Sequence, residues 1–203
     1  MTNAHSKVVL GSQYTKTDLS KIFNEPNLEG VREGIYSLKP HNAVLLFVDL
    51  VKAGKEDRFH FNDYFDGDVF HWDSQTTQNI NSPRIQSIVR KQVEVLLFCR
   101  LQRKIKNITQ PFYYCGTLEY LEHDLKTANP VHLVFLSNDF NETTSNLQLK
   151  ILYEWKPENI GKATSNNDYH KNGTAVKFRV DQKKPNYTER KGLVTSRRTR
   201  WNA

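Results

Sequence analysis

The sequence predicts a mainly β protein of the α+β class, with a bent antiparallel sheet or a β-barrel and a short N-terminal helix. Short apolar segments rich in Val, Leu and Phe recur at nearly regular spacing over the first 156 residues, as in antiparallel sheets and barrels. Helix-period segments are few, which disfavours a parallel βαβ sheet. The 203 residues, 37% of them hydrophobic, suffice for one core, so we expect a single domain with a tail.

The N-terminal helix is predicted between residues 15 and 24, after a loose lead-in. Thr15 or Thr17 can cap its first turn, since a hydroxyl oxygen accepts a hydrogen bond from a free backbone N–H there. Leu19 and Phe23 are four residues apart and therefore share one face of the helix.

The strands are predicted from the pattern of apolar residues. Residues 43–51 are almost uninterrupted in apolar character, which predicts a strand buried on both faces. Residues 58–64 alternate between polar and apolar, which predicts a half-buried strand. The other predicted elements are a helix over 84–90 and strands over 93–100, 111–118, 131–136 and 147–155, and residues 176–180 could add a last strand.

Residues 70–75, with the sequence Phe-His-Trp-Asp-Ser-Gln, are the most informative segment of the chain. A strand that buries one face would alternate such side chains with Val, Ile or Leu, so packing alone does not explain them. An indole can stack on a nucleobase while carboxylate, hydroxyl and amide groups read the edge of that base. We interpret the segment as a recognition surface, the alternative for Trp72 being an anchor at a strand end.

The net charge of +7 is concentrated at the C-terminal end of the chain. Residues 157–203 hold 11 Lys and Arg against 4 Asp and Glu, which accounts for the whole surplus and leaves residues 1–156 neutral. We therefore expect a recognition domain over 1–156 and a basic linker or tail over 157–203. Such a tail suits attraction to a polyanion, although a solvated linker can also be basic by chance.

The two cysteines, Cys99 and Cys115, each lie inside an apolar strand-like segment. Two buried, reduced thiols are therefore expected in preference to a disulfide, which favours the cytoplasm. The chain has no apolar run of the roughly 20 residues that a membrane helix needs, and its start lacks the apolar segment of a signal peptide. We expect a cytoplasmic protein without a membrane partner.

Five motifs together resemble a known family. In order they are Asn62-Asp63-Tyr64, the 70–75 segment, Ser82-Pro83-Arg84, Leu97-Phe98-Cys99-Arg100 and Phe112-Tyr113-Tyr114-Cys115-Gly116-Thr117-Leu118. This order is similar to the domain of unknown function found at the C-terminus of phospholipase D-helicase restriction proteins and upstream of HNH nucleases. The resemblance covers roughly residues 10–156.

The resemblance implies a PUA/SRA-like β-barrel that acts as the target-recognition domain of a modification-dependent restriction endonuclease. Its expected partner is double-stranded DNA with a modified base, a methylated or hydroxymethylated cytosine that is flipped out of the duplex. Residues 188–197 are similar to the segment that leads into an HNH nuclease, but no nuclease motif follows before Ala203. The nuclease would then be a module in cis or a partner in trans, and this chain would be non-catalytic.

The site residues expected from the motifs form two groups, a base pocket and a set of contacts to the DNA backbone. We expect neither a cofactor nor a metal in either group. For Arg100, the alternative to a backbone contact is an ion pair at a strand end. The base pocket would be formed by Tyr64, Phe70, Trp72, Asp73, Ser74 and Gln75, and the DNA backbone would be contacted by Arg84, Arg90, Lys91, Arg100, Arg190, Arg197 and Arg198.

Catalytic patterns in the sequence are weak. Asp139, Glu154 and Lys156 imitate the Asp and Glu-x-Lys set of metal-dependent nucleases, which leaves a small nuclease as an alternative. A second alternative is a B3-like domain that reads unmodified sequence. The histidines have no zinc-ligand spacing, and Ser74, His71 and Asp73 are too close along an extended chain to form a Ser-His-Asp relay.

Overall fold

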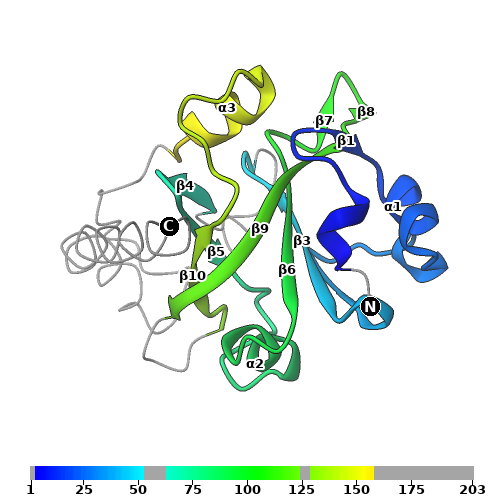
Figure 1. The fold of residues 1–203 in the computed structure, drawn as a ribbon, viewed down its shortest axis with the longest axis vertical. Coiled ribbons are helices and arrows are strands. Elements are labelled where there is room, and N and C mark those ends of the chain that lie inside the picture. Colours follow the sequence, from blue (N-terminus) through cyan, green and yellow to red (C-terminus); the bar gives the residue numbers. More distant parts are fainter. Residues whose placement is uncertain (1–2, 53–62, 124–128, 158–203) are drawn as a thin grey trace, which may run out of the picture. The chain divides into compact units, whose positions relative to one another are not determined.

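The computed structural model describes residues 3–52, 63–123 and 129–157. In these ranges the centre of the fold is an eight-stranded mixed sheet in the order β2-β3-β6-β9-β10-β5-β4, with β1 paired to β9, and β7 and β8 form a separate two-stranded sheet (Figure 1). The strands of the main sheet are β1 (Gln13–Tyr14), β2 (Ile35–Leu38), β3 (Ala43–Asp49), β4 (Tyr64–Asp66), β5 (Val69–Asp73), β6 (Glu94–Arg100), β9 (Phe112–His123) and β10 (His132–Ser137). The small sheet contains β7 (Lys104–Ile105) and β8 (Ile108–Thr109).

The remaining elements are short helices. The predicted fold class, mainly β within the α+β class, is confirmed. No helix in the described ranges is long and apolar enough to cross a membrane. The α-helices are α1 (Lys16–Phe23), α2 (Pro83–Val89) and α3 (Leu147–Glu154), and the 3-10 helices are η1 (Ala4–Lys7), η2 (Pro26–Leu28) and η3 (Lys39–His41).

One strand pair departs from the expected antiparallel arrangement. β3 and β6 are parallel, with Cα partners from Ala43 and Glu94 at one end to Asp49 and Arg100 at the other. The chain between them contains β4, β5 and α2, and such a long crossover is what a parallel pair requires. The carboxyl ends of β3 and β6 consequently meet at one edge of the fold.

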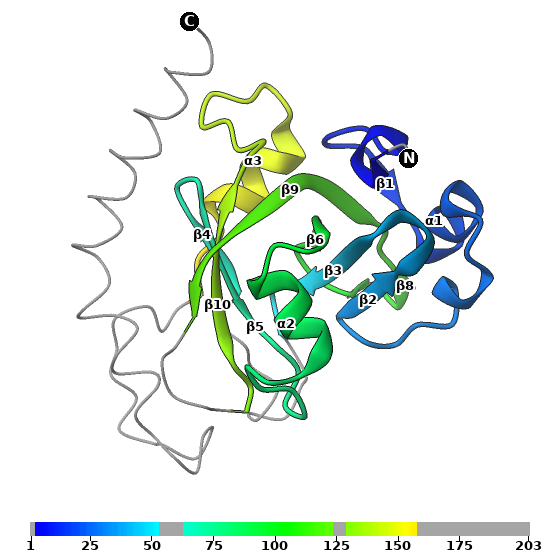
Figure 2. The same ribbon diagram turned by 60° about the horizontal axis from the view of Figure 1, so that its bottom comes forward.

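The strands β3 and β6 are buried on both faces, as predicted for residues 43–51. On one face their side chains join a core that includes Ile85 of α2 and Leu152 of α3. On the opposite face they join a second core that includes Leu19 and Phe23 of α1. The two cores explain why β3 is continuously apolar, and Figure 2 gives the view of α1 and α2 around the β3–β6 pair.

The predicted helix at residues 15–24 is confirmed as α1, and Thr15 is its N-cap. The Thr15 hydroxyl accepts a hydrogen bond from the Asp18 N–H at 3.1 Å, and the Asp18 carboxylate accepts one from the Thr15 N–H at 2.8 Å. The Thr15 hydroxyl also lies 2.7 Å from the Asp18 Oδ2, and the hydrogen bonds that the carboxylate accepts from the Thr15 hydroxyl and N–H lower the pKa of Asp18. The helix predicted over 84–90 is confirmed as α2.

The strand predicted over residues 147–155 is wrong, because this segment forms α3. The Asn146 side chain caps the helix by accepting hydrogen bonds from the N–H groups of Gln148 and Leu149. Its buried residues include Leu149, Leu152 and Tyr153, and their spacing of three and four places them on one helical face. The segment also has apolar residues at every second position from 147 to 155, and this alternation gave it its strand-like character.

Other predictions fall on residues outside the described ranges. The strand at 58–64 is covered only from residue 63, where Tyr64 begins β4. The tail, with its strand at 176–180, lies outside the described residues. Cys99 and Cys115 are free and buried, as predicted, and burial raises the pKa of the Cys99 thiol.

Gly116 offers a direct test of the packing of β9. Its φ of +98° is unfavourable for other residues, and an added Cβ would lie 2.5 Å from the Asp139 Cβ. We expect Gly116→Ala to lower the free energy of unfolding by about 1–3 kcal/mol. Gly30→Ala is the control, because a Cβ added there would meet no atom within 4 Å. Urea denaturation measures both, and equal effects would contradict the packing.

Candidate functional site

A pocket of about 670 Å³ lies at the carboxyl ends of the parallel strands β3 and β6. It combines aromatic rings, cations and carboxylates, and the segment 74–77 after β5 forms part of its wall. The aromatic residues are Phe47, Trp72 and Phe112, the cations are Lys16, Arg32, Lys52, Arg100 and Arg103, and the acids are Glu33, Asp49, Asp63 and Asp73.

Arg100 lines the pocket and contacts a carboxylate, a carbonyl oxygen and an aromatic ring. Its Nε donates to the Asp49 Oδ1 at 2.6 Å, and its Nη1 donates to the Gln110 carbonyl oxygen at 2.6 Å. The guanidinium carbon lies 3.9 Å from the centroid of the Phe112 ring. Arg100 is only 8% exposed, so its assignment to the DNA backbone is corrected in favour of the strand-end ion pair.

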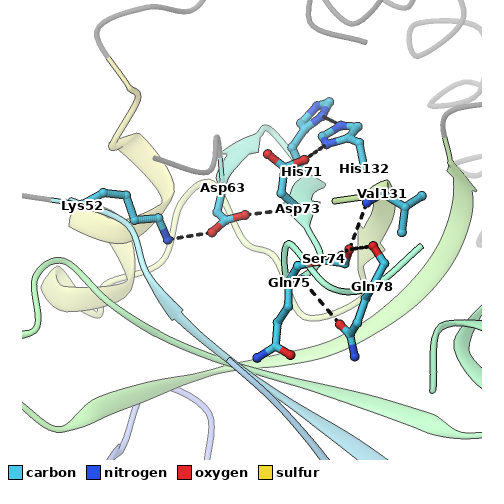
Figure 3. Close-up of polar contacts among 9 residues, drawn as sticks. All are labelled: Lys52, Asp63, His71, Asp73, Ser74, Gln75, Gln78, Val131 and His132. Atoms are coloured by element: carbon cyan, nitrogen blue, oxygen red, sulfur yellow. Dashed lines mark hydrogen bonds and ion pairs between the residues drawn. The ribbon is translucent and has the colours of Figure 1, made fainter. Parts of the chain in front are cut away.

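A second buried ion pair joins the segments that flank the pocket. Lys52 Nζ lies 2.8 Å from the Asp63 Oδ2, and the Asp63 Oδ1 accepts a hydrogen bond from the Asp73 N–H at 2.9 Å (Figure 3). Burial raises the pKa of the Asp63 carboxyl, while the positive charge of Lys52 opposes this shift. Removing one partner of such a pair costs about 3–5 kcal/mol, since a buried charge is left uncompensated.

Two histidines extend the buried polar network beyond Asp73. His132 Nδ1 lies 2.9 Å from the Asp73 Oδ1, and His132 Nε2 lies 3.2 Å from His71 Nδ1 (Figure 3). All three side chains are buried. When the His132 Nδ1–H donates to the carboxylate, its Nε2 accepts from the His71 Nδ1–H, so one tautomer of His132 is selected. In this network the Asp73 carboxylate accepts a hydrogen bond from His132.

Sequence reasoning missed this histidine pair. His71 and Asp73 are two residues apart on β5 and share a face, which the sequence could have indicated. His132 belongs to β10, where its Cα pairs with that of Asp73, and this long-range pairing left no local signal. The group that bridges His71 and Asp73 in the structure is His132.

The structure brings four of the six predicted pocket residues together: Trp72, Asp73, Ser74 and Gln75. Phe70 is a correction, because it is fully buried in the core, where its ring lies 4.7 Å from that of Phe65. Phe70 thus alternates with His71 on β5 and faces the core instead of the pocket.

Tyr64 is a second correction, because it does not line the pocket. Its ring stacks on His71, with centroids 4.5 Å apart and planes at 9°. Since neighbouring residues of a strand face opposite sides, this stack lies on the opposite face of β5 from Trp72. Tyr64 therefore covers the histidine pair.

Ser74 and Gln75 differ in what they can offer a ligand. The Ser74 hydroxyl accepts from the Val131 N–H at 2.9 Å and is 3.2 Å from the Gln78 carbonyl oxygen (Figure 3). These contacts join β5 to the start of β10, so the predicted edge-reading role of Ser74 is corrected to a structural one. The side-chain amide of Gln75 makes no hydrogen bond with the described residues and is half-buried.

Lys16 and Phe47 are pocket residues that the sequence did not reveal. Lys16 Nζ lies 4.6 Å from the centroid of the Phe47 ring and donates to the Val31 carbonyl oxygen at 2.6 Å. Burial, together with the positive charge of Arg100, lowers the pKa of Lys16 to about 8. In sequence Lys16 is an ordinary residue of a helix first turn, and Phe47 is one of many apolar residues of a core strand.

The other residues predicted to contact the DNA backbone have different surroundings. Arg84 Nη1 donates to the Glu33 carboxylate and to the Ile35 carbonyl oxygen, each at 3.1 Å. Lys91 forms an exposed ion pair of 2.6 Å with Glu119, and Arg90 is exposed. The predicted contacts Arg190, Arg197 and Arg198 lie outside the described residues.

The residues of the nuclease alternative have separate roles. The Asp139 carboxylate accepts hydrogen bonds from the N–H and the hydroxyl of Thr117. Glu154 is exposed on α3, 3.8 Å from Lys150, and Lys156 Nζ lies 5.4 Å from the centroid of the Tyr64 ring. Among the described residues, no group of three or more His, Cys, Asp or Glu side chains could hold a metal ion.

Comparison with known proteins gives a family. A family model described as "Domain of unknown function (DUF3427)" matches residues 8–150. The chain belongs to the DUF3427 family. No curated protein matches the chain. Among solved structures, the MspJI restriction endonuclease in complex with a 27-mer oligonucleotide is similar, with a TM-score of 0.38 and 12% identity over 56% of this chain and 36% of the MspJI chain.

The lowered pKa of Lys16 gives a test of the pocket electrostatics. The folded pKa of about 8 lies below the ordinary lysine value of 10.5, so the unfolded chain binds more protons than the folded one between these two pH values. The free energy of unfolding, relative to that of a Lys16→Met variant, should therefore rise with pH over this range. Denaturation series at several pH values measure the difference, and a difference independent of pH would contradict this arrangement.

Proposed function

We propose that this DUF3427 domain binds double-stranded DNA and holds a modified cytosine, methylated or hydroxymethylated, flipped out of the duplex into the pocket beside Trp72. In this proposal it is the PUA/SRA-like recognition domain of a modification-dependent restriction system, and an HNH nuclease acts in cis or in trans. The observation that carries the proposal is the pocket itself, whose wall combines three aromatic residues with Asp73 and Gln75 of the segment that the sequence singled out.

The size and lining of the pocket support a nucleobase as the ligand. Its volume of about 670 Å³ falls within the range of about 300–1,000 Å³ that is usual for small-molecule sites. Flipping a base costs a few kcal/mol, and stacking on an aromatic ring returns about 1–3 kcal/mol per base. Phe47, Trp72 and Phe112 are the aromatic candidates for this contact.

The polar groups of the pocket favour cytosine over thymine. The exocyclic amino group of cytosine is a hydrogen-bond donor, whereas thymine has a carbonyl acceptor at the same position. The Asp73 carboxylate is an acceptor and would pair with the amino group. The Gln75 amide can both donate and accept, so it suits the adjacent part of the base edge.

Affinity that does not depend on sequence would come from cations outside the pocket. Arg90 is exposed beside α2, and residues 157–203 carry the net charge of +7, including Arg190, Arg197 and Arg198. Each phosphate that a cation neutralises releases counterions, so binding through these residues would weaken steeply as salt increases. Specific and nonspecific binding are then separable by ionic strength.

The test measures binding to matched duplexes that carry cytosine, 5-methylcytosine or 5-hydroxymethylcytosine, at two salt concentrations. We expect the wild-type protein to prefer one modified duplex at both. Asp73→Asn should lose about 10- to 100-fold on that duplex, because the amide oxygen would accept from His132 and leave only the amide nitrogen, a donor, to face the cytosine amino group. It should keep the salt-dependent background binding.

The controls separate recognition from stability. Glu119→Gln removes a carboxylate on the exposed surface and should leave the preference unchanged. Trp72→Ala is unsuitable, because Trp72 is 3% exposed and truncating a buried Trp costs about 3–5 kcal/mol. If Asp73→Asn fails to fold, Gln75→Ala replaces it. Equal wild-type binding to all duplexes that collapses with salt would contradict the proposal, and a sequence preference that ignores modification would favour a B3-like reader.

A further inference from the structure

The small hairpin of β7 and β8 is separate from the main sheet (Figure 1). Its Cα pairs are Lys104 with Thr109 and Ile105 with Ile108. The two residues between the strands, Lys106 and Asn107, have φ values of 48° and 67°. Two consecutive residues with positive φ make a turn of the type I′ class, which matches the twist of a tight hairpin. The hairpin is therefore a short, well-defined projection.

The tip of the hairpin exposes two apolar side chains. Ile108 is 68% exposed and Ile105 is 45% exposed. Their Cα atoms are directly paired across the two strands, so the side chains lie next to each other on one face. Adjacent exposed isoleucines at the end of a projection gain stability only when something covers them, which indicates a contact surface.

The charge of the same segment selects the kind of partner. Residues 101–110 contain Arg103, Lys104 and Lys106 and no Asp or Glu. Cations around an apolar tip complement a partner that is anionic outside and apolar inside. A DNA duplex has this character, with phosphates outside and stacked bases inside, and apolar side chains are known to wedge between base steps.

The base of the hairpin belongs to the pocket. Arg103, Thr109 and Gln110 line the pocket, and the Gln110 N–H donates to the Arg103 carbonyl oxygen at 3.0 Å. The Gln110 carbonyl oxygen accepts from Arg100, which is paired with Asp49. The hairpin is thus fixed at the edge of the pocket, where a duplex with one base in the pocket would lie against it.

We infer that the β7–β8 hairpin inserts Ile105 and Ile108 into the duplex beside the base held in the pocket. The two side chains fill the space that the flipped base leaves, and Arg103, Lys104 and Lys106 contact the adjacent phosphates. This inference rests on the proposed function and adds to it the group that keeps the duplex open.

The test compares two duplexes that differ in how much opening they require. One carries the preferred modified cytosine in a fully paired duplex, and the other carries it opposite an abasic site, where the base is already unpaired. The double variant Ile105→Ser with Ile108→Ser should lose about tenfold or more on the paired duplex, and under about threefold on the other, because unpairing costs least where the pair is missing. Val9→Ser, at a 66% exposed residue outside the hairpin, should change neither.

The other outcomes would overturn the inference. Unchanged binding of the double variant, or an equal loss on both duplexes, would exclude insertion into the duplex while leaving the pocket proposal intact. A wild-type protein without any preference for modified DNA would overturn the proposed function, and the inference with it. Wild-type binding to phosphatidylserine vesicles that is lost in the double variant, with DNA binding unchanged, would assign the hairpin to a membrane surface.

Discussion

The ion pair between Asp49 and Arg100 is the contact on which the rest of the site depends. It joins the last residues of the parallel strands β3 and β6, and the same guanidinium covers the Phe112 ring and holds the Gln110 carbonyl oxygen. One arginine therefore fixes two strand ends, an aromatic wall and the base of the β7–β8 hairpin. Both side chains are largely buried, so loss of either would leave a charge without its partner.

A second buried network, from Lys52 through Asp63 and Asp73 to His132 and His71, lies beside the first. Buried polar groups are expensive unless they are fully hydrogen-bonded, and packing alone would favour apolar residues at these positions. Proteins depart from local rules of this kind mainly at functional sites. The two networks together place carboxylates and aromatic rings around one cavity, an arrangement that suits the nucleobase recognition proposed above.

Much of the fold, and part of the site, could be predicted from sequence. Local patterns were sufficient for α1, for the doubly buried strand β3 and for the polar segment from Trp72 to Gln75. They failed for α3, where one set of apolar residues fits both a strand and a helix, and for the parallel pairing of β3 with β6, which depends on a long crossover. The roles of Lys16, Phe47 and His132 come from contacts between distant segments, and Phe70 and Ser74 are placed by the strand alternation and by a turn.

The most direct measurement is the fluorescence of a base analogue placed next to the target modified cytosine in a duplex, because stacking on that cytosine quenches the analogue and flipping the cytosine out relieves the quenching. The account predicts a rise when the protein is added and a much smaller rise with Asp73→Asn at saturating protein concentration. Unchanged fluorescence on a duplex that the protein demonstrably binds would contradict the central claim, since the base would then remain stacked while the protein is bound.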